Sequence, residues 1–162
     1  MSEGPAAMPR LVLDASVFLR SVFEDERGHD QALALVRDHA LGLVQLIAPS
    51  LLPYEVVNGV VQALRGKRPT RQLEVEEARR ILVALEALRI SLKPLAPPEL
   101  LQVAQAHERT AYDAAYVALA EREEVPLITG DKRLYRGIRA RFPAVIWVED
   151  YRPLAPEIEA RS

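Results

Sequence analysis

Four acidic residues stand where strands end or helices begin, and they are the side chains in this sequence best suited to chemistry. They are Asp14, Glu55, Asp113 and Asp131. Asp14 follows an apolar run in VLDASV, and Asp131 follows another in LITGDKRL. Glu55 lies near the start of the helical segment PSLLPYEVVNGVVQAL, and Asp113 lies in TAYDAAYVALAE. If the fold brings the four carboxylates together, we expect them to form one site.

Carboxylates that converge cannot all remain ionised and unpaired. Two of them about 4 Å apart repel by roughly 4 kcal/mol at an effective dielectric constant near 20. Either some hold a proton with a raised pKa, or a divalent cation neutralises them. The chain has no cysteine, and no histidine stands beside these acids, so the oxygen ligands favour Mg²⁺ or Mn²⁺ over zinc. Such a centre suits hydrolysis of a phosphodiester.

Each acid also has a purely structural explanation. An aspartate after a strand often caps the following helix, which applies to Asp14 and Asp131. An acid in the first turn of a helix, such as Glu55, interacts favourably with the helix dipole. Asp113 shares a helix face with apolar residues that ought to be buried, unless it forms a T-x-x-D capping box with Thr110. The residue pattern leaves these alternatives open.

Further polar and basic residues lie near the acids in the sequence. Thr129 ends a predicted strand, and its hydroxyl group can orient a water molecule or ligate a metal there. Asn58 shares a helix face with Glu55. A basic cluster after Asp131 is suited to hold a polyanion, although a solvated helix face would have the same composition. Its members singled out for binding are Lys132, Arg133, Arg136 and Arg139.

Short apolar runs alternate with segments of helical period along the chain. We predict strands at 10–14, 44–48, 91–95, 126–129 and 144–148. We predict helices at 15–24, 30–41, 51–64, 71–89, 98–107, 111–123 and 131–139. This alternation favours an α/β fold, a three-layer α/β/α sandwich with a mainly parallel central sheet. In such sheets the site lies at the carboxyl ends of the strands, where Asp14 and Asp131 are expected.

Length and composition favour one soluble globular domain. The chain has 162 residues, of which 49% are hydrophobic and 27% charged. We predict a domain at 10–151 between an N-terminal tail at 1–9 and a C-terminal tail at 152–162. With 21 basic and 23 acidic residues, the net charge of −2 means that binding to nucleic acid would need a local basic patch. We expect a cytoplasmic protein with no secretory signal and no membrane-spanning segment.

The order of these motifs resembles that of PIN-domain nucleases, and most closely the VapC-type toxins of bacterial toxin–antitoxin modules. The resemblance rests on VLDASV, PYEVVNGV, TAYDAAYVALAE and VPLITGDKRL, and it covers about residues 10–151. It implies a PIN-like fold and a metal-dependent endoribonuclease, usually a homodimer, that a small antitoxin protein inhibits. It also implies that the four acids bind Mg²⁺ or Mn²⁺, with Thr129 as an accessory hydroxyl and lesser polar roles for Ser16 and Asn58.

Two other classes of protein share part of this pattern. A phosphoacceptor signalling domain also has an acidic Mg²⁺ pocket, but it needs an adjacent acid pair after the first strand and an aspartate on a middle strand. Here Asp14 is followed by Ala15 and Ser16, and the middle strand runs into Pro94. A non-catalytic module that binds nucleic acid or a partner would have no use for the four acids. The apolar surface of the helix at 71–89 is wide enough to meet a second protein chain as well as the core.

Overall fold

One parallel sheet forms the centre of the molecule. The computed structural model describes residues 7–68 and 72–156, and within these ranges it contains five strands in the order β3-β2-β1-β4-β5. All strand pairs are parallel. The strands are β1 (Arg10–Leu13), β2 (Gln45–Pro49), β3 (Ser91–Lys93), β4 (Leu127–Thr129) and β5 (Val145–Trp147). Each predicted strand is therefore present within one or two residues of its expected position.

The described ranges also contain each of the seven predicted helices. They are α1 (Ala15–Val22), α2 (His29–Ala40), α3 (Leu52–Leu64), α4 (Val75–Ala87), α5 (Pro97–His107), α6 (Ala111–Glu123) and α7 (Lys132–Ile138). The largest difference is the start of α4, predicted at Arg71, a residue outside the described ranges. The reciprocal capping box of Glu74 and Glu77 begins this helix at Val75.

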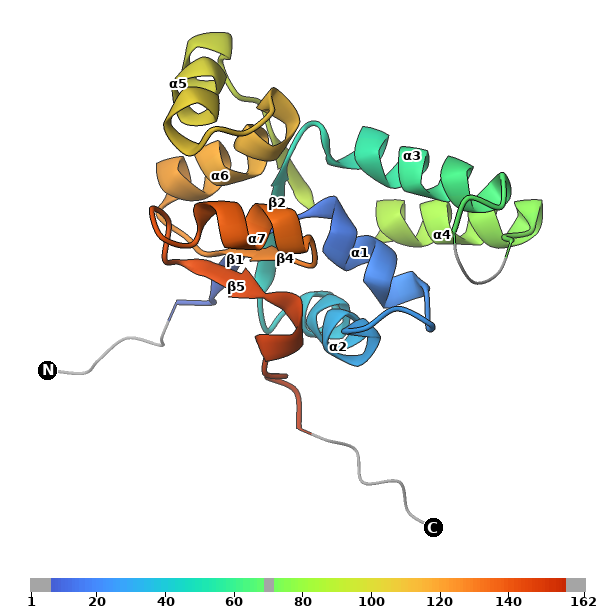
Figure 1. Ribbon diagram of the computed structural model, residues 1–162. Helices are drawn as coiled ribbons and strands as arrows, with labels where there is room; N and C mark the ends of the chain where they lie inside the picture. Colours follow the sequence, from blue (N-terminus) through green and yellow to red (C-terminus); the bar gives the residue numbers. More distant parts are fainter. Residues whose placement is uncertain (1–6, 69–71, 157–162) are drawn as a thin grey trace, which may run out of the picture.

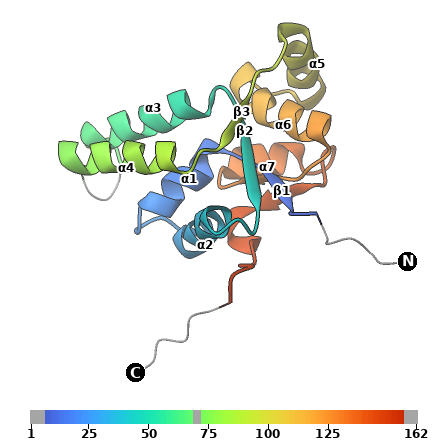
Figure 2. The same ribbon diagram turned by 180° about the vertical axis from the view of Figure 1, so that it is seen from behind.

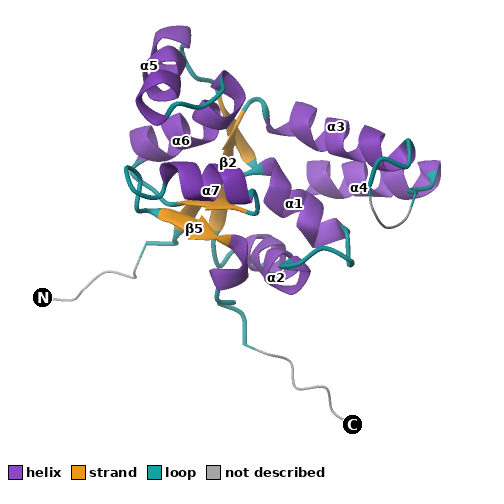
Figure 3. Ribbon diagram, viewed as in Figure 1, coloured by secondary structure: helices purple, strands orange, loops and turns teal. Residues whose placement is uncertain are grey.

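Helices cover both faces of the sheet, which confirms the predicted α/β/α sandwich. Helix α6 packs on β1, β2 and β4, helix α7 packs on β4 and β5, and α5 lies outside α6. Helices α1 and α2 lie on the other side of the sheet (Figures 1 and 2). Helices α3 and α4 form an arm that projects sideways from the sandwich, as the view coloured by secondary structure also shows (Figure 3).

Burial explains why the strands read as continuous apolar runs. A parallel sheet covered on both faces hides both sides of each strand, and Leu11, Val12 and Leu13 are accordingly all buried. Helix α6 is enclosed in the same way, since each residue from 114 to 120 is buried. In the part of the chain that the structure describes, no helix is long and apolar enough to cross a membrane.

The strand order places a crevice where the chemistry is expected. The chain runs from β1 outward to β2 and β3 and then returns to the other side of β1 as β4. Ligands of open α/β sheets bind at such a reversal, beyond the carboxyl ends of the strands. Asp14 and Asp131 follow the two strands on either side of the reversal. The strand before Pro94 is β3, which is third of the five along the chain and lies at the edge of the sheet.

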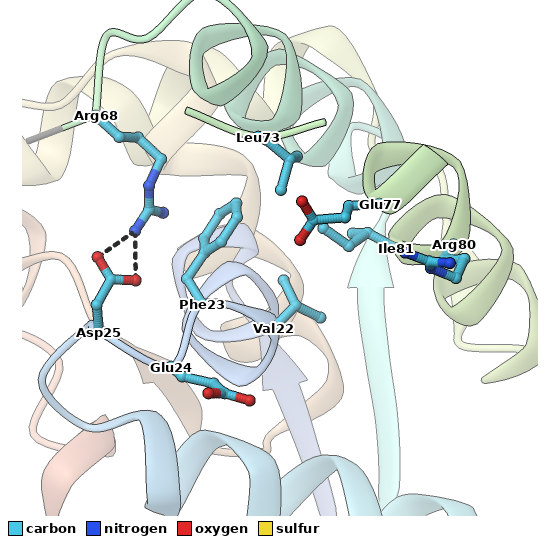
Figure 4. A pocket seen from close by; sticks show the side chains of 9 residues that line it. All are labelled: Val22, Phe23, Glu24, Asp25, Arg68, Leu73, Glu77, Arg80 and Ile81. Carbon is cyan, nitrogen blue, oxygen red and sulfur yellow. Dashed lines mark hydrogen bonds and ion pairs between the residues drawn. The ribbon is translucent and has the colours of Figure 1, made fainter. Parts of the chain in front are cut away.

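The arm has its own apolar cluster and a pocket beside it. Phe23 at the end of α1 packs with Val60, Leu73 and Ala78. The pocket has a volume of about 530 Å³, and the Arg68 guanidinium forms an ion pair with Asp25 at its edge, at 3.2 Å (Figure 4). None of the four candidate acids lines this pocket. This cavity is therefore separate from the acidic site at the sheet edge.

Candidate active site

Asp14 is held at the carboxyl end of β1 by two hydroxyl groups. It occupies the N-cap position of α1, but its carboxylate makes no capping hydrogen bond. Instead, Asp14 Oδ2 accepts hydrogen bonds from Ser16 Oγ at 2.6 Å and from Thr129 Oγ1 at 2.7 Å. Only 7% of Asp14 is exposed. The structural alternative of a helix cap therefore does not explain this buried carboxylate.

The same hydroxyl groups tie the loop after β4 to the loop after β1. Thr129 Oγ1 accepts a hydrogen bond from the Asp131 amide at 3.0 Å, and Ser16 Oγ accepts one from the Gly130 amide at 2.9 Å. Asp131 does cap its helix, since its Oδ1 accepts hydrogen bonds from the Arg133 and Leu134 amides. Its capping role uses one carboxylate oxygen and leaves the other open.

Arg20 is a second clamp on this loop that sequence reasoning missed. Arg20 Nη2 donates a hydrogen bond to the Gly130 carbonyl at 2.6 Å, and its guanidinium lies 5.8 Å from the centre of the Trp147 ring. A Cβ atom at position 130 would lie 2.7 Å from Arg20 Cδ and closer still to Nε. A side chain at position 130 would therefore displace the Arg20 guanidinium group from the loop.

Glu55 and Asp113 reach the site from the first turns of α3 and α6. Thr110 Oγ1 accepts a hydrogen bond from the Asp113 amide at 3.2 Å, which is only half of the proposed capping box and leaves the Asp113 carboxylate free. Glu55 Oε1 and the Tyr116 hydroxyl are both buried, and neither makes a hydrogen bond of ordinary geometry to another described residue. The two side chains nevertheless lie close together, because the Tyr116 hydroxyl opposes the rise in the Glu55 pKa that burial causes. A buried carboxylate oxygen without a donor is costly unless a ligand or cation meets it.

Three of the acids line one open pocket, which we call the acidic pocket. It has a volume of about 440 Å³. Its lining residues are Glu55, Glu108, Arg109, Thr110, Tyr112, Asp113, Asp131 and Arg133. Asp14 is not part of this lining but is close enough to interact electrostatically with Glu55 and Asp131. The fold thus brings residues from four separate elements to one sheet edge.

Burial and mutual repulsion raise the pKa values of three of these acids. Burial, together with the charges of Glu55 and Asp131, raises the pKa of Asp14 to about 6, despite the hydrogen bonds from Ser16 and Thr129. Burial also raises the pKa of Glu55, with Asp113 and Asp131 adding to the shift. The pKa of Asp113 is raised by burial and by Asp131, while nearby arginines oppose the change. The acids therefore behave as the interacting group that the sequence suggested.

The donor set fits a hard divalent cation. In the described part of the chain, no three acidic or histidine side chains are arranged as a complete metal-ligand group. Repulsion between carboxylates opposes so close an approach. Several oxygens are nevertheless available to a cation. Glu55 Oε1 has only the nearby Tyr116 hydroxyl as a donor, and the second oxygens of Asp14 and Asp131 accept no hydrogen bond from a described residue. Mg²⁺ and Mn²⁺ prefer such ligands.

The predicted polar and basic residues differ in how near they lie to the pocket. Arg133 lines it, whereas Lys132 and Arg136 on α7 and Arg139 directly after this helix are exposed and outside its lining. Asn58 is exposed on α3 and is also outside the lining. Sequence reasoning missed Arg109 and Tyr112, although both lie close in sequence to Asp113. The only sign of their role in the sequence was that they stand close to Asp113, a candidate metal-binding residue.

Comparison with known proteins identifies the family. The family model named PIN domain matches residues 11–138, which is most of the chain. The chain belongs to the PIN-domain family.

Its curated relatives carry related names. Ribonuclease VapC3 of Pyrobaculum aerophilum is 34% identical over 142 residues, which cover 85% of this chain and 98% of the relative. Ribonuclease VapC1 of Mycobacterium tuberculosis is 42% identical over 88 residues, which cover 54% of this chain and 63% of that relative. The match thus spans less than two thirds of the mycobacterial protein.

A solved structure shows the same fold. The crystal structure of PAE2754 from Pyrobaculum aerophilum aligns with a TM-score of 0.64 at 24% sequence identity. The alignment covers 88% of this chain and 85% of that one. The fold predicted from the motifs is thereby confirmed.

Proposed function

We propose that this protein is a metal-dependent endoribonuclease that hydrolyses RNA phosphodiester bonds. The observation that carries the proposal is the meeting of Asp14, Glu55, Asp113 and Asp131 at the reversal point of the sheet. The position of the four acids, the buried Glu55 oxygen with no hydrogen bond of ordinary geometry and the raised pKa values of Asp14, Glu55 and Asp113 all favour a site that binds a cation. The curated relatives named ribonucleases support RNA as the substrate.

The four acids would hold Mg²⁺ or Mn²⁺. When bound, the cation polarises a phosphate oxygen and lowers the pKa of a water molecule. Thr129 and Ser16 orient Asp14 through their hydroxyl groups, and Thr129 also fixes the Asp131 amide. We assign Asn58 an accessory role beside Glu55 on α3, where it is exposed to an incoming substrate.

Basic residues would hold the RNA on either side of the acidic pocket. The carboxylates repel a phosphate backbone, so attraction must come from flanking cations. We assign this role to Lys132, Arg133, Arg136 and Arg139. Arg133 acts at the pocket and the other three act along the exposed face of α7.

In the cell, the proposed role is that of the toxin in a type II toxin–antitoxin pair. The VapC names of the relatives support this role and a small antitoxin protein as partner. We further propose a cytoplasmic homodimer. The exposed Val75 and Val83 on α4 offer apolar surface to a second chain, with 57% and 65% of each residue exposed.

A cleavage assay tests the enzymatic proposal. The purified chain should cut RNA in Mg²⁺ or Mn²⁺, lose the activity in EDTA and regain it when excess metal is restored. Asp113→Asn should remain inactive when metal is present. Asp30 is an acid in the first turn of α2, away from the site, and Asp30→Asn should cut RNA normally. Cleavage that persists in EDTA would contradict metal dependence. RNA binding without cleavage would favour the non-catalytic alternative.

A further inference from the structure

Tyr112 presents an aromatic ring to solvent at the acidic pocket. It directly precedes Asp113 in the first turn of α6, lines the pocket and is 63% exposed. The next tyrosine in the helix, Tyr116, is by contrast buried in the core. An exposed ring at the mouth of a polar pocket adds little to the stability of the fold. It is well placed to meet a flat, apolar group of a bound ligand.

Two arginines lie in the same pocket lining as this ring. Arg109 Nη1 donates a hydrogen bond to the Arg133 carbonyl at 3.3 Å, and Arg109 Nε is buried with no hydrogen-bond partner in the described ranges. A Cβ atom at Gly137 would lie 2.9 Å from Arg109 Nε and closer still to Nη2, so this glycine leaves room for the guanidinium. Arg109 is thereby held between α6 and α7, with its charge at the pocket.

We propose that Tyr112 stacks on a base of single-stranded RNA while Arg109 and Arg133 bind phosphates on either side of the scissile bond. This inference rests on the proposed ribonuclease function and names residues that determine its substrate. The bases of a duplex are stacked on one another, so only an unpaired base is free to lie on the ring. Aromatic platforms flanked by cations are the usual means of holding single strands.

The Tyr112 ring and the two arginines recognise different parts of the RNA. An aromatic face accepts any base, so Tyr112 selects strand structure rather than sequence. Arginines near the carboxylates offset the repulsion that the phosphate backbone meets, and both already interact with Asp113. The pocket, at about 440 Å³, is open enough to admit a nucleotide between them.

Tyr54 provides a matched control. It directly precedes Glu55 in α3, as Tyr112 precedes Asp113 in α6, and 77% of it is exposed. Unlike Tyr112, it is not part of the lining of the acidic pocket. Loss of the Tyr54 ring therefore removes an exposed aromatic side chain beside the candidate metal-binding residue Glu55, but it leaves the Tyr112 ring in place.

The test measures RNA binding in an Asp14→Asn background, which prevents turnover. The probe is a fluorescein-labelled single-stranded RNA of roughly 12 nucleotides and mixed sequence, followed by anisotropy. Tyr112→Ala should weaken binding on the order of 10- to 100-fold, whereas Tyr112→Phe and Tyr54→Ala should bind as the parent does. Tyr112→Leu should lose most of the affinity, because it keeps apolar bulk but no ring. The same strand annealed to its complement should bind equally well with and without the ring.

An abasic scan of the probe then identifies the contact. Removal of one base at the stacking position should weaken binding to the parent and should add nothing to the loss caused by Tyr112→Ala. Two results would overturn the stacking proposal and leave the ring free for contact with a protein. One is an unchanged RNA affinity in Tyr112→Ala. The other is a loss of affinity from the abasic site that simply adds to the loss from the substitution. These outcomes are independent of cleavage. If the wild-type protein cuts RNA but Tyr112→Ala binds RNA normally in the Asp14→Asn background, only this inference is refuted. If the wild-type protein never cuts RNA but binding still depends on the Tyr112 ring, only the ribonuclease proposal is refuted.

Discussion

Replacement of Asp14 by asparagine should stabilise the metal-free protein at neutral pH. Asp14 is 7% exposed, and burial raises its pKa from 3.8 to about 6. A carboxyl whose pKa is higher in the folded state binds more protons when folded, so stability falls as pH rises between these two values. The folded protein thus loses about 2 kcal/mol of stability from this group between pH 4 and pH 7, out of about 3 kcal/mol for the whole shift. Asparagine is neutral throughout and keeps an oxygen for Ser16 and Thr129.

The assay is urea unfolding in EDTA, followed through the fluorescence of Trp147, the single tryptophan in the chain. At pH 4 the free energies of unfolding of the two proteins should differ by less than about 1 kcal/mol, because the folded aspartate is then almost fully protonated. At pH 7.5 Asp14→Asn should be more stable by about 3 kcal/mol with an unchanged m-value. Saturating Mn²⁺ should narrow or reverse the difference, because the wild-type site binds the metal more tightly.

Two results would refute this reasoning. One is an Asp14→Asn protein that is no more stable than wild type at pH 7.5 without metal. The other is a stability difference that stays constant from pH 4 to pH 7.5, which would mean that Asp14 is not destabilised by its charge.

Three further predictions concern the metal, the loop clamp and the basic helix. Millimolar Mg²⁺ or Mn²⁺ should raise the melting temperature, and Asp113→Asn should reduce the shift; no shift with either ion would argue against a shared site. Gly130→Ala should cost about 1–3 kcal/mol in unfolding free energy and abolish most cleavage, and an added Arg20→Ala should recover part of the stability, whereas a normal single variant would show that the loop tolerates a side chain. Neutralising Lys132 and Arg136 with glutamine should weaken RNA binding and reduce its salt slope by up to about one per lost phosphate contact, with metal binding unchanged; an unaltered salt slope would remove α7 from the path of the substrate.

The sequence was most informative where burial is continuous. Buried strands such as β1 and β4 are short apolar runs with an acid soon after, so both their positions and the location of Asp14 and Asp131 followed from the pattern. The order of strands did not, since an apolar run does not reveal its neighbours. β3, for example, is third of the five strands along the chain but lies at the edge of the sheet.

The candidate acids were found from their positions, while the residues that support them were not. The Arg20 guanidinium holds the Gly130 carbonyl across 110 positions of sequence. Arg109 and Tyr112 belong to the pocket because α6 and α7 meet there, which only the folded chain shows. Asp131 illustrates a different limit, since its capping and its pocket position were treated as alternatives and the structure shows both.

A crystal of the protein soaked in Mn²⁺, measured for anomalous scattering, tests the central claim most directly. The account predicts an anomalous peak bounded by the carboxylates of Asp14, Glu55, Asp113 and Asp131, and its loss in Asp113→Asn crystals treated in the same way. A peak that lies only at another site, such as the pocket beside Arg68 and Asp25, would contradict the claim that the four acids form one metal centre. So would a map with no peak at the acidic pocket when the soak exceeds the concentration that supports cleavage.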